Sequence, residues 1–212
     1  MTHPYWPLFD LRLTTPDLTL AVATEADQVP LSDLLPDDVE LDPALPEYAI
    51  DDVRIQRGIA THQAYWKVFG DWRTESWMLP FSVFRGDELI GLQRIEGEDF
   101  LATRTVDSFS MLSPDVRGKG YGKQMRDAVL ALAFGPLEAA RAITSAWQDN
   151  HASLGVSRAV GYVANGEALC RRGDGVDVMI HLRLTREDWL ARSDRPAVEI
   201  SGFEPCRPLF GL

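Results

Sequence analysis

The residue types best suited to chemistry in this chain form a glycine-rich hexapeptide, Arg117-Gly118-Lys119-Gly120-Tyr121-Gly122. An apolar run typical of a strand precedes it at 109–112, and an amphipathic run typical of a helix follows at 121–134. A strand that turns through glycines into a helix leaves several backbone N–H groups pointing into one concavity, where the helix dipole adds positive potential. The side chains of Arg117 and Lys119 add charge. The hexapeptide therefore predicts a pyrophosphate-binding turn.

The spacing of the glycines excludes two common phosphate-binding loops. A P-loop needs Gly, four residues and then Gly-Lys-Ser/Thr, but Gly122-Lys123 is followed by Gln124, and Arg117 stands at the position of the first glycine. A dinucleotide-binding fingerprint would need a glycine at position 123, which is lysine. What remains is the pattern Arg/Gln-x-x-Gly-x-Gly/Ala, which Arg117, Gly120 and Gly122 satisfy. This pattern is short, so the surrounding segments must decide its meaning.

Two further segments supply that context. After the hexapeptide, Asn150 ends an apolar run, Ser153 and Val156 lie in a predicted short helix, and Gly161-Tyr162 opens the next strand. Before it, residues 89–93 read Leu-Ile-Gly-Leu-Gln. Together with the hexapeptide, these segments resemble the GNAT superfamily of N-acetyltransferases. Their sequences are most similar to its ribosomal-protein-acetyltransferase branch. The resemblance runs from about residue 11 to about residue 190.

The two ends of the chain carry a closer resemblance. Residues 6–12 and 206–211 look like an actinobacterial subgroup, one mycobacterial member of which is regarded as a succinyltransferase. The superfamily implies an α/β (α+β) GNAT fold: a central mixed, mostly antiparallel twisted sheet of about seven strands flanked by helices, with two splayed central strands that admit pantetheine. We therefore expect residues 1–212 to form a single acyltransferase domain with a core at about 11–190 and a C-terminal tail at 191–212.

The resemblance implies an acyl-CoA-dependent N-acyltransferase. Such an enzyme would transfer an acetyl or succinyl group from acetyl-CoA or succinyl-CoA to a primary amine by direct attack in a ternary complex. A protein N-terminus, a lysine and a small amine all remain open as acceptors. No cysteine or serine lies in a nucleophile-elbow pattern, so no covalent acyl-enzyme is expected. The alternative hypothesis is a non-catalytic regulatory module that binds acyl-CoA.

The donor site implied by the family pattern combines the strand end, the hexapeptide and the second motif. The residues concerned are Met111, Leu112, Arg117, Gly118, Lys119, Gly120, Tyr121, Gly122, Lys123, Asn150 and Ser153. Backbone N–H groups around Met111 and Leu112 would polarise the thioester carbonyl. Asn150 would hydrogen-bond pantetheine or, equally well, simply cap the helix that follows it.

Three residues are the catalytic candidates, and Asn150 is one of them. Asp107 lies ten residues before Arg117 on the predicted strand 103–112, where relatives often carry a glutamate. Its carboxylate would take the amine proton or anchor the substrate ammonium, or it is only a strand-end aspartate bonded to a neighbouring loop. Ser157 stands where many relatives have a tyrosine. A serine hydroxyl can donate a hydrogen bond to the departing sulfur, but it is a poor proton source.

Composition and charge limit the classes of molecule that this protein is expected to bind. A formal net charge of −11 and a sequence pI of about 4.8 disfavour binding to nucleic acid or an anionic membrane surface. The cysteines, Cys170 and Cys206, and the four histidines show no metal-ligand spacing, so no metal is predicted. No apolar run is long enough for a membrane span or a leader, which predicts a cytoplasmic protein. We predict a homodimer.

Hydrophobic periodicity places the remaining elements along the chain. Strands are expected at 18–22, 78–84, 89–95, 103–112, 142–147 and 176–184, and helices at 51–69, 121–134, 151–160 and from 185. The acidic stretch 30–46 contains four prolines and is expected to be a loop, serving as a connector or as a wall or lid on the substrate side. Trp66, Trp72 and Trp77 are expected to pack in the core, with one of them available to line the acceptor pocket.

Overall fold

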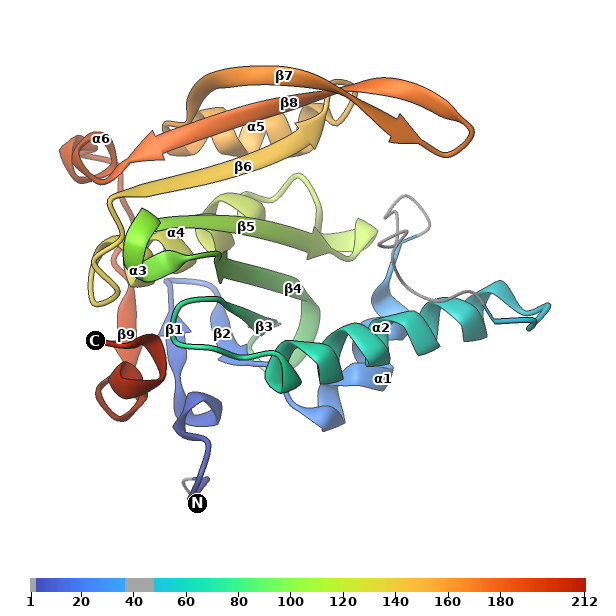
Figure 1. Cartoon of the computed structure of the whole chain (residues 1–212), viewed down its shortest axis with the longest axis horizontal. Helices are drawn as coiled ribbons and strands as arrows, with labels where there is room; N and C mark the ends of the chain where they lie inside the picture. The colour runs from blue at the N-terminus through green and yellow to red at the C-terminus, as the bar shows by residue number, and fades with distance from the viewer. Residues whose placement is uncertain (1–2, 37–47) are drawn as a thin grey trace.

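The computed structural model describes residues 3–36 and 48–212, which form one twisted sheet flanked by helices (Figure 1). The strand order is β7-β8-β6-β5-β4-β3-β2-β1-β9, and β5 and β6 are the parallel neighbours in an otherwise antiparallel sheet. The strands are β1 Arg12–Thr14, β2 Thr19–Val22, β3 Trp77–Arg85, β4 Glu88–Gly97, β5 Thr105–Leu112, β6 Arg141–Trp147, β7 Val163–Arg172, β8 Gly175–Thr185 and β9 Glu199–Ser201. The described sheet thus has nine strands where about seven were expected. Strand β1 and the edge strand β9 are each three residues long, too short for their alternation to be recognised in the sequence.

The helices lie on both faces of the sheet. They are α1 Gln28–Leu34, α2 Val53–Gly70, α3 Phe100–Thr103, α4 Tyr121–Phe134, α5 His151–Val160 and α6 Arg186–Ala191, with 3-10 turns η1 Pro7–Asp10, η2 Glu25–Asp27, η3 Pro114–Val116 and η4 Glu204–Phe210. Val106 packs beneath α4, whereas the next residue, Asp107, faces a cavity lined by α2. Since successive strand residues point to opposite faces, α4 and α2 cover opposite sides of β5.

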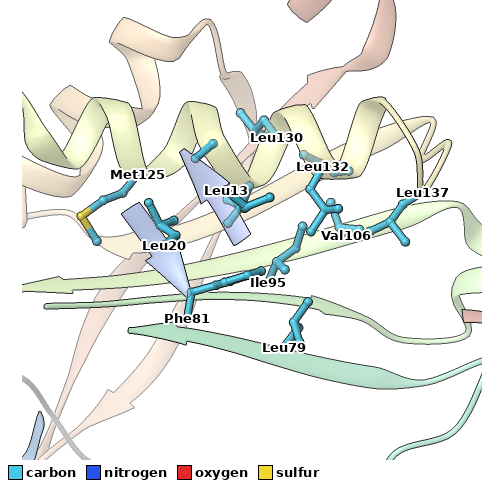
Figure 2. Close-up of a cluster of buried hydrophobic side chains, with 14 of the residues drawn as sticks. Leu13, Leu20, Leu79, Phe81, Ile95, Val106, Met125, Leu130, Leu132 and Leu137 are labelled. Carbon is cyan, nitrogen blue, oxygen red and sulfur yellow. The ribbon is translucent and has the colours of Figure 1, made fainter. Parts of the chain in front are cut away.

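The predicted helix 121–134 is confirmed as α4, and its apolar face fills the core beneath it (Figure 2). Gly120 precedes it with a φ of 84°, and Gly135 ends it. The residues on the apolar face of this helix are fully buried: Met125, Ala128, Val129, Leu132 and Ala133. They pack against strand residues such as Phe81 and Ile95. Each large apolar side chain buried in this way contributes roughly 1.5–3 kcal/mol relative to an exposed one.

The central strands β5 and β6 separate almost as soon as they meet. They pair at Thr105 with Arg141 and at Val106 with Ala142, and no further. Beyond that point β5 stays paired with β4 as far as Leu112, and β6 stays paired with β8. Each strand is therefore held by its outer neighbour while the inner edges diverge. The splayed arrangement expected from the family is present, and the gap opens at residue 107.

The start of β5 differs from expectation. We predicted a strand from residue 103, but 100–103 form the short helix α3 and the strand begins at Thr105. Arg104, with a φ of 45°, lies in the left-handed region and ends that helix. The backbone reversal at this residue separates the two elements.

The C-terminal residues 191–212 are integrated into the fold. Strand β9 pairs with β1, and η4 places Phe210 against the rings of Trp72 and Trp77. The indole nitrogen of Trp72 donates to the carbonyl of Leu209 at 2.9 Å. Of the three tryptophans expected in the core, Trp66 is the exception, with 55% of its surface exposed. It is held by a hydrogen bond to Glu25 at the start of η2.

The acidic stretch 30–46 is described only in part. Helix α1 occupies its beginning, as far as Leu34. The rest of this stretch, residues 37–46, lies outside the described residues, so its predicted role as a connector, wall or lid stays a prediction.

Candidate functional site

The predicted pyrophosphate-binding turn has the backbone geometry of an anion site. Gly118 and Gly120 have φ angles of 75° and 84°, a region that L side chains rarely adopt. Within the described chain, the amide N–H groups of residues 118–122 make no hydrogen bond. No side chain caps the N-terminus of α4. Five amides and a positive helix end thus face the same exposed turn, which suits a phosphate ligand.

The charged side chains around this turn are mostly engaged elsewhere. The Nε of Arg117 donates to the carbonyl of Leu112 at 3.1 Å, and the Nζ of Lys119 donates to the carbonyl of Asp115 at 3.0 Å. The Nζ of Lys123 forms an ion pair with Asp194 at 2.7 Å. An anion at this turn would therefore be bound mainly by backbone N–H groups, and the charged side chains would contribute less. Tyr121 packs beneath the guanidinium of Arg85, with 5.9 Å between that group and the ring centroid.

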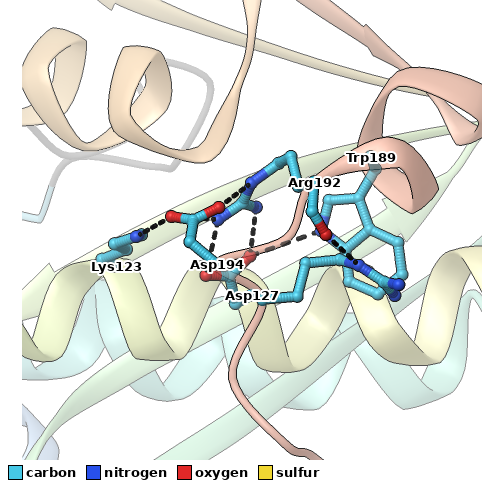
Figure 3. A network of polar contacts seen from close by, with 6 residues as sticks. Lys123, Asp127, Trp189, Arg192 and Asp194 are labelled. Carbon is cyan, nitrogen blue, oxygen red and sulfur yellow. Dashed lines mark hydrogen bonds and ion pairs between the residues drawn. The ribbon is translucent and has the colours of Figure 1, made fainter.

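Lys123 belongs to a polar network that ties the C-terminal segment to α4 (Figure 3). Asp127 is fully buried on α4 and accepts a 2.7 Å bond from Nη1 of Arg192 and a 3.3 Å bond from the indole of Trp189. Arg192 also binds Asp194, which in turn binds Lys123. Asp127 and Arg192 are 65 residues apart in sequence, so no local sequence pattern predicts their contact. The network thus joins the first two turns of α4 to the C-terminal segment, directly after the predicted pyrophosphate-binding turn.

The gap between β5 and β6 exposes main-chain groups of alternate β5 residues. Thr144 on β6 donates its hydroxyl to the carbonyl of Ser108 at 3.3 Å, so Ser108 turns its main chain toward the gap. The alternation of a strand then directs Ser110 and Leu112 the same way.

Met111 faces the other way. A Cβ on Gly91 of β4 would lie 2.2 Å from the carbonyl oxygen of Met111, so this residue directs its main chain to β4. The N–H groups available to a ligand in the gap are consequently those of Ser110 and Leu112. Ser110 was missed from the sequence because strand phase cannot be read without a register.

A cavity of about 680 Å³ lies on the α2 face, next to the opening of the gap. Its walls come from α2, β3, β4 and β5, and Trp77 contributes to them. The charged residues lining it are Asp71, Glu96, Glu98, Asp107, Lys67 and Arg94. Carboxylates outnumber cations in this set, so the cavity is suited to a positively charged guest.

Asp107 occupies the position where the cavity meets the gap. It is the first β5 residue beyond the last pair with β6, and it lies opposite Glu96 on β4. Burial raises the pKa of Asp107 to about 6, and the nearby charge of Glu96 adds to the rise. Arg126 and Arg94 act in the opposite direction, as does the 2.5 Å hydrogen bond that its carboxylate accepts from the amide of Ser108. The carboxylate is ionised at neutral pH, yet it is a stronger base than an ordinary aspartate.

The second motif forms α5 as predicted at 151–160. The Oδ1 of Asn150 accepts the amide N–H of Ser153 at 3.0 Å, the capping arrangement that was one of its two predicted roles. Ser157 is 1% exposed and donates its hydroxyl to the carbonyl of Ser153 at 3.0 Å. A hydrogen bond from Ser157 to a departing sulfur would require breaking this contact. The catalytic roles of both residues stay predictions.

Residues 3–36 and 48–212 contain neither a metal-binding cluster nor a helix that could span a membrane. No group of three histidine, cysteine, aspartate or glutamate side chains lies close enough together there to hold a metal ion. None of the helices in these ranges combines the length and hydropathy needed to cross a bilayer.

Comparison with known proteins agrees with this geometry. Residues 18–163 match the family described as acetyltransferase (GNAT) domain. Mycobacterium smegmatis RimJ, solved in complex with CoA-disulfide, superimposes with a TM-score of 0.70 at 20% identity, covering 88% of this chain and 92% of that one. A chimera of Vibrio cholerae spermidine N-acetyltransferase SpeG and hSSAT gives a TM-score of 0.64 at 15% identity, covering 83% and 99%. The chain belongs to the GNAT acetyltransferase family.

Proposed function

We propose that this protein transfers an acyl group from a coenzyme A thioester to a primary amine, with Asp107 as the general base. One observation carries the proposal: Asp107 borders both the gap between β5 and β6 and the acidic cavity on the α2 face. A donor lying in the gap and an amine lying in the cavity would meet at this carboxylate. Its pKa of about 6 suits proton acceptance near neutral pH.

The donor would be held mainly by main-chain groups. Amides of residues 118–122 would bind the pyrophosphate of coenzyme A, and pantetheine would lie in the gap. The N–H groups of Ser110 and Leu112 would donate to the thioester carbonyl, which takes on negative charge during attack. Ser110 thus replaces Met111 in the assignment made from sequence.

The reaction would proceed by direct attack. The amine nitrogen forms a bond to the thioester carbonyl carbon, the C–S bond breaks, and coenzyme A leaves as a thiolate. The proton lost by nitrogen passes to Asp107, directly or through a water molecule. Coenzyme A thiolate is then protonated by solvent or, as a secondary contribution, through Ser157.

The acceptor is proposed to be a basic amine. The excess of carboxylates over cations in the cavity favours an ammonium-bearing group, which must lose a proton before attack. A protein N-terminus, a lysine side chain and a small amine all meet this description. Spermidine, named for the Vibrio cholerae enzyme, represents the small amines.

For the donor, acetyl-CoA is the first choice because the matching family is one of acetyltransferases. Succinyl-CoA is the second, raised by the ends of the chain. We keep the interpretation of residues 1–212 as one acyltransferase domain, and a homodimer, as parts of this proposal. Size-exclusion chromatography with light scattering measures the oligomeric state directly.

The test is thioester consumption with acetyl-CoA and succinyl-CoA against peptide N-termini, lysine peptides and polyamines. Turnover with at least one pair supports the proposal, and an Asp107→Asn variant should lose that turnover while still binding coenzyme A. The alternative, a regulatory module that binds acyl-CoA without reacting, has one observation in its favour: Ser157 replaces a tyrosine and its hydroxyl is already engaged. Coenzyme A binding with no turnover for any acceptor would select that alternative.

A further inference from the structure

A buried guanidinium that forms no ion pair among the described residues lies on α4, facing the sheet. Arg126 is 2% exposed, and its Nε and Nη1 atoms have no hydrogen-bond partner among the described residues. Its guanidinium lies 5.7 Å from the ring centroid of Tyr162. The hydroxyls of Tyr162 and Ser108 are buried and unpartnered as well. We call Arg126, Tyr162 and Ser108 the Arg126 cluster.

The three side chains of this cluster are mutual neighbours. Burial raises the pKa of the Tyr162 phenol, and the closeness of Arg126 and Ser108 to its hydroxyl partly offsets that rise. One guanidinium and two hydroxyl groups thus approach one another, and four of their polar atoms lack partners. This is a set of hydrogen-bond donors with a positive charge at its centre.

The cluster lies at the narrow end of the gap between β5 and β6. Ser108 is two residues beyond Val106, where the strands last pair, and its carbonyl accepts the hydroxyl of Thr144 across the gap. The phosphate-binding turn lies at the other end of β5. Gly122, which faces Leu112 and Val156, is one helical turn before Arg126, so α4 leads about 6 Å back from the turn toward the cluster.

An isolated buried cation is costly, and proteins normally pair it. The charge of Arg126 lowers the pKa of Asp107, but no ion pair joins the two among the described residues, and the Asp107 carboxylate lines the cavity on the α2 face and accepts the amide N–H of Ser108. Asp127, the neighbouring carboxylate on α4, is bound to Arg192. The cluster therefore has capacity for an anion, and a ligand entering the gap from the phosphate-binding turn would bring its far end there.

We propose that the Arg126 cluster binds the terminal carboxylate of the acyl group carried by coenzyme A. The donor class is then a monothioester of a short dicarboxylic acid. This inference rests on the proposed function, because it assumes that pantetheine lies in the gap. An acetyl group has no atom to offer the guanidinium, whereas a four-carbon chain ending in a carboxylate supplies two oxygens that match its paired N–H donors.

A binding experiment separates the charge from the chain length. Titration calorimetry is run with coenzyme A, S-butyl-CoA and S-(3-carboxypropyl)-CoA, two unreactive thioethers of similar length. We expect the carboxylate to tighten binding at least about 10-fold over the butyl compound, in keeping with a buried charge-assisted pair. In Arg126→Met that advantage should vanish, and in Tyr162→Phe it should shrink several-fold. Arg186→Met, on the exposed surface of α6, is the matched control and should retain the preference.

Folding failure would not obscure the result. Removing an unpaired buried charge in favour of a hydrophobic side chain is often neutral or stabilising, and circular dichroism checks the variant. Equal affinity of wild type for both thioethers would overturn the proposal and leave the cluster as the site of a buried water. If coenzyme A itself does not bind, the proposed function fails instead. A turnover ratio of succinyl-CoA to butyryl-CoA well above one, falling to about one in Arg126→Met, would extend the result to catalysis.

Discussion

The donor side and the acceptor side of the candidate site consist of different chemical groups: backbone amides on one side and side chains on the other. On the donor side, the proposed phosphate-binding turn is one continuous segment, and the groups that would bind the diphosphate are the backbone amides of residues 118–122. On the acceptor side, the cavity is lined by side chains from α2, β3, β4 and β5, which are distant in sequence. Backbone amides recognise the same diphosphate whatever the side chains are, whereas side chains can be exchanged one by one. Under the proposed function, the donor side would therefore determine the cosubstrate, and the acceptor side would determine which amine is modified.

The largest effect is expected from a substitution that disrupts the donor side of the site. Replacing Gly120 with glutamate forces an L residue into a φ of 84° and places a negative charge where the diphosphate binds. Coenzyme A binding, followed by calorimetry, should weaken by about 100-fold or more. Gly173→Glu is the matched control, because Gly173 also has a positive φ, 54°, and open space around it. If both variants bind coenzyme A like wild type, the backbone turn is not the diphosphate site.

The next largest effect is expected from a substitution that should lower turnover without weakening coenzyme A binding. Asp107→Asn removes the base but leaves the phosphate-binding turn intact, so kcat should fall by about 10²–10⁴-fold while the Kd for coenzyme A stays within about 2-fold. Asp87→Asn, in the exposed turn between β3 and β4, removes a carboxylate away from the site and should retain full activity. Unchanged turnover in Asp107→Asn would exclude that residue from the mechanism.

A smaller effect concerns stability. The folded-state pKa of Asp107 is raised to about 6 from the ordinary aspartate value of 3.8, so the folded state prefers the protonated form. Its contribution is therefore favourable below about pH 4 and is lost as the pH rises through about 6. Asp107→Asn should raise the free energy of unfolding at pH 7.5 by about 1–2 kcal/mol, after allowance for partial exposure.

Urea denaturation at two pH values checks this prediction. At pH 4 wild type and Asp107→Asn should be equally stable, because Asp107 is protonated there in the folded state. A variant less stable than wild type at pH 7.5 would mean that the ionised carboxylate is structural.

The smallest effect probes the side chains that surround the backbone turn. Asp194→Asn frees Lys123 from a partly exposed ion pair, an interaction worth roughly 0.2–1 kcal/mol. Coenzyme A affinity should rise by no more than about 3-fold, and this gain should disappear at high salt. A change of 30-fold or more would show that Lys123, and not the backbone, dominates diphosphate binding.

The glycine turn and helix α4 could be predicted from the sequence because their signals are local. Glycines at 118, 120 and 122 mark the turn, Gly120 and Gly135 bound α4, and the apolar face of that helix follows from its period. Asp107 was found by its spacing from the family pattern, and the structure supplies the reason it stands out: it is the first residue after the strands part.

Long-range features escaped sequence reasoning. From hydrophobic periodicity alone, Arg126 would be predicted to lie on the polar, exposed face of an amphipathic helix. In the structure it is buried beside Tyr162 and Ser108, which are distant in sequence. The pair of Asp127 with Arg192 depends in the same way on the C-terminal segment packing on α4. The cavity likewise needs α2 and β4 to lie together, a contact that no local pattern encodes.

The central claim is that Asp107 accepts the proton of an amine that attacks a donor held in the gap. It is tested most directly by measuring kcat/KM against pH for wild type and Asp107→Asn with the same acceptor, and dividing the two profiles so that the titration of the acceptor cancels. The ratio should rise about tenfold per pH unit up to about pH 6 and level off above it, because only the ionised carboxylate acts as base. A ratio that stays flat across this range would contradict the account.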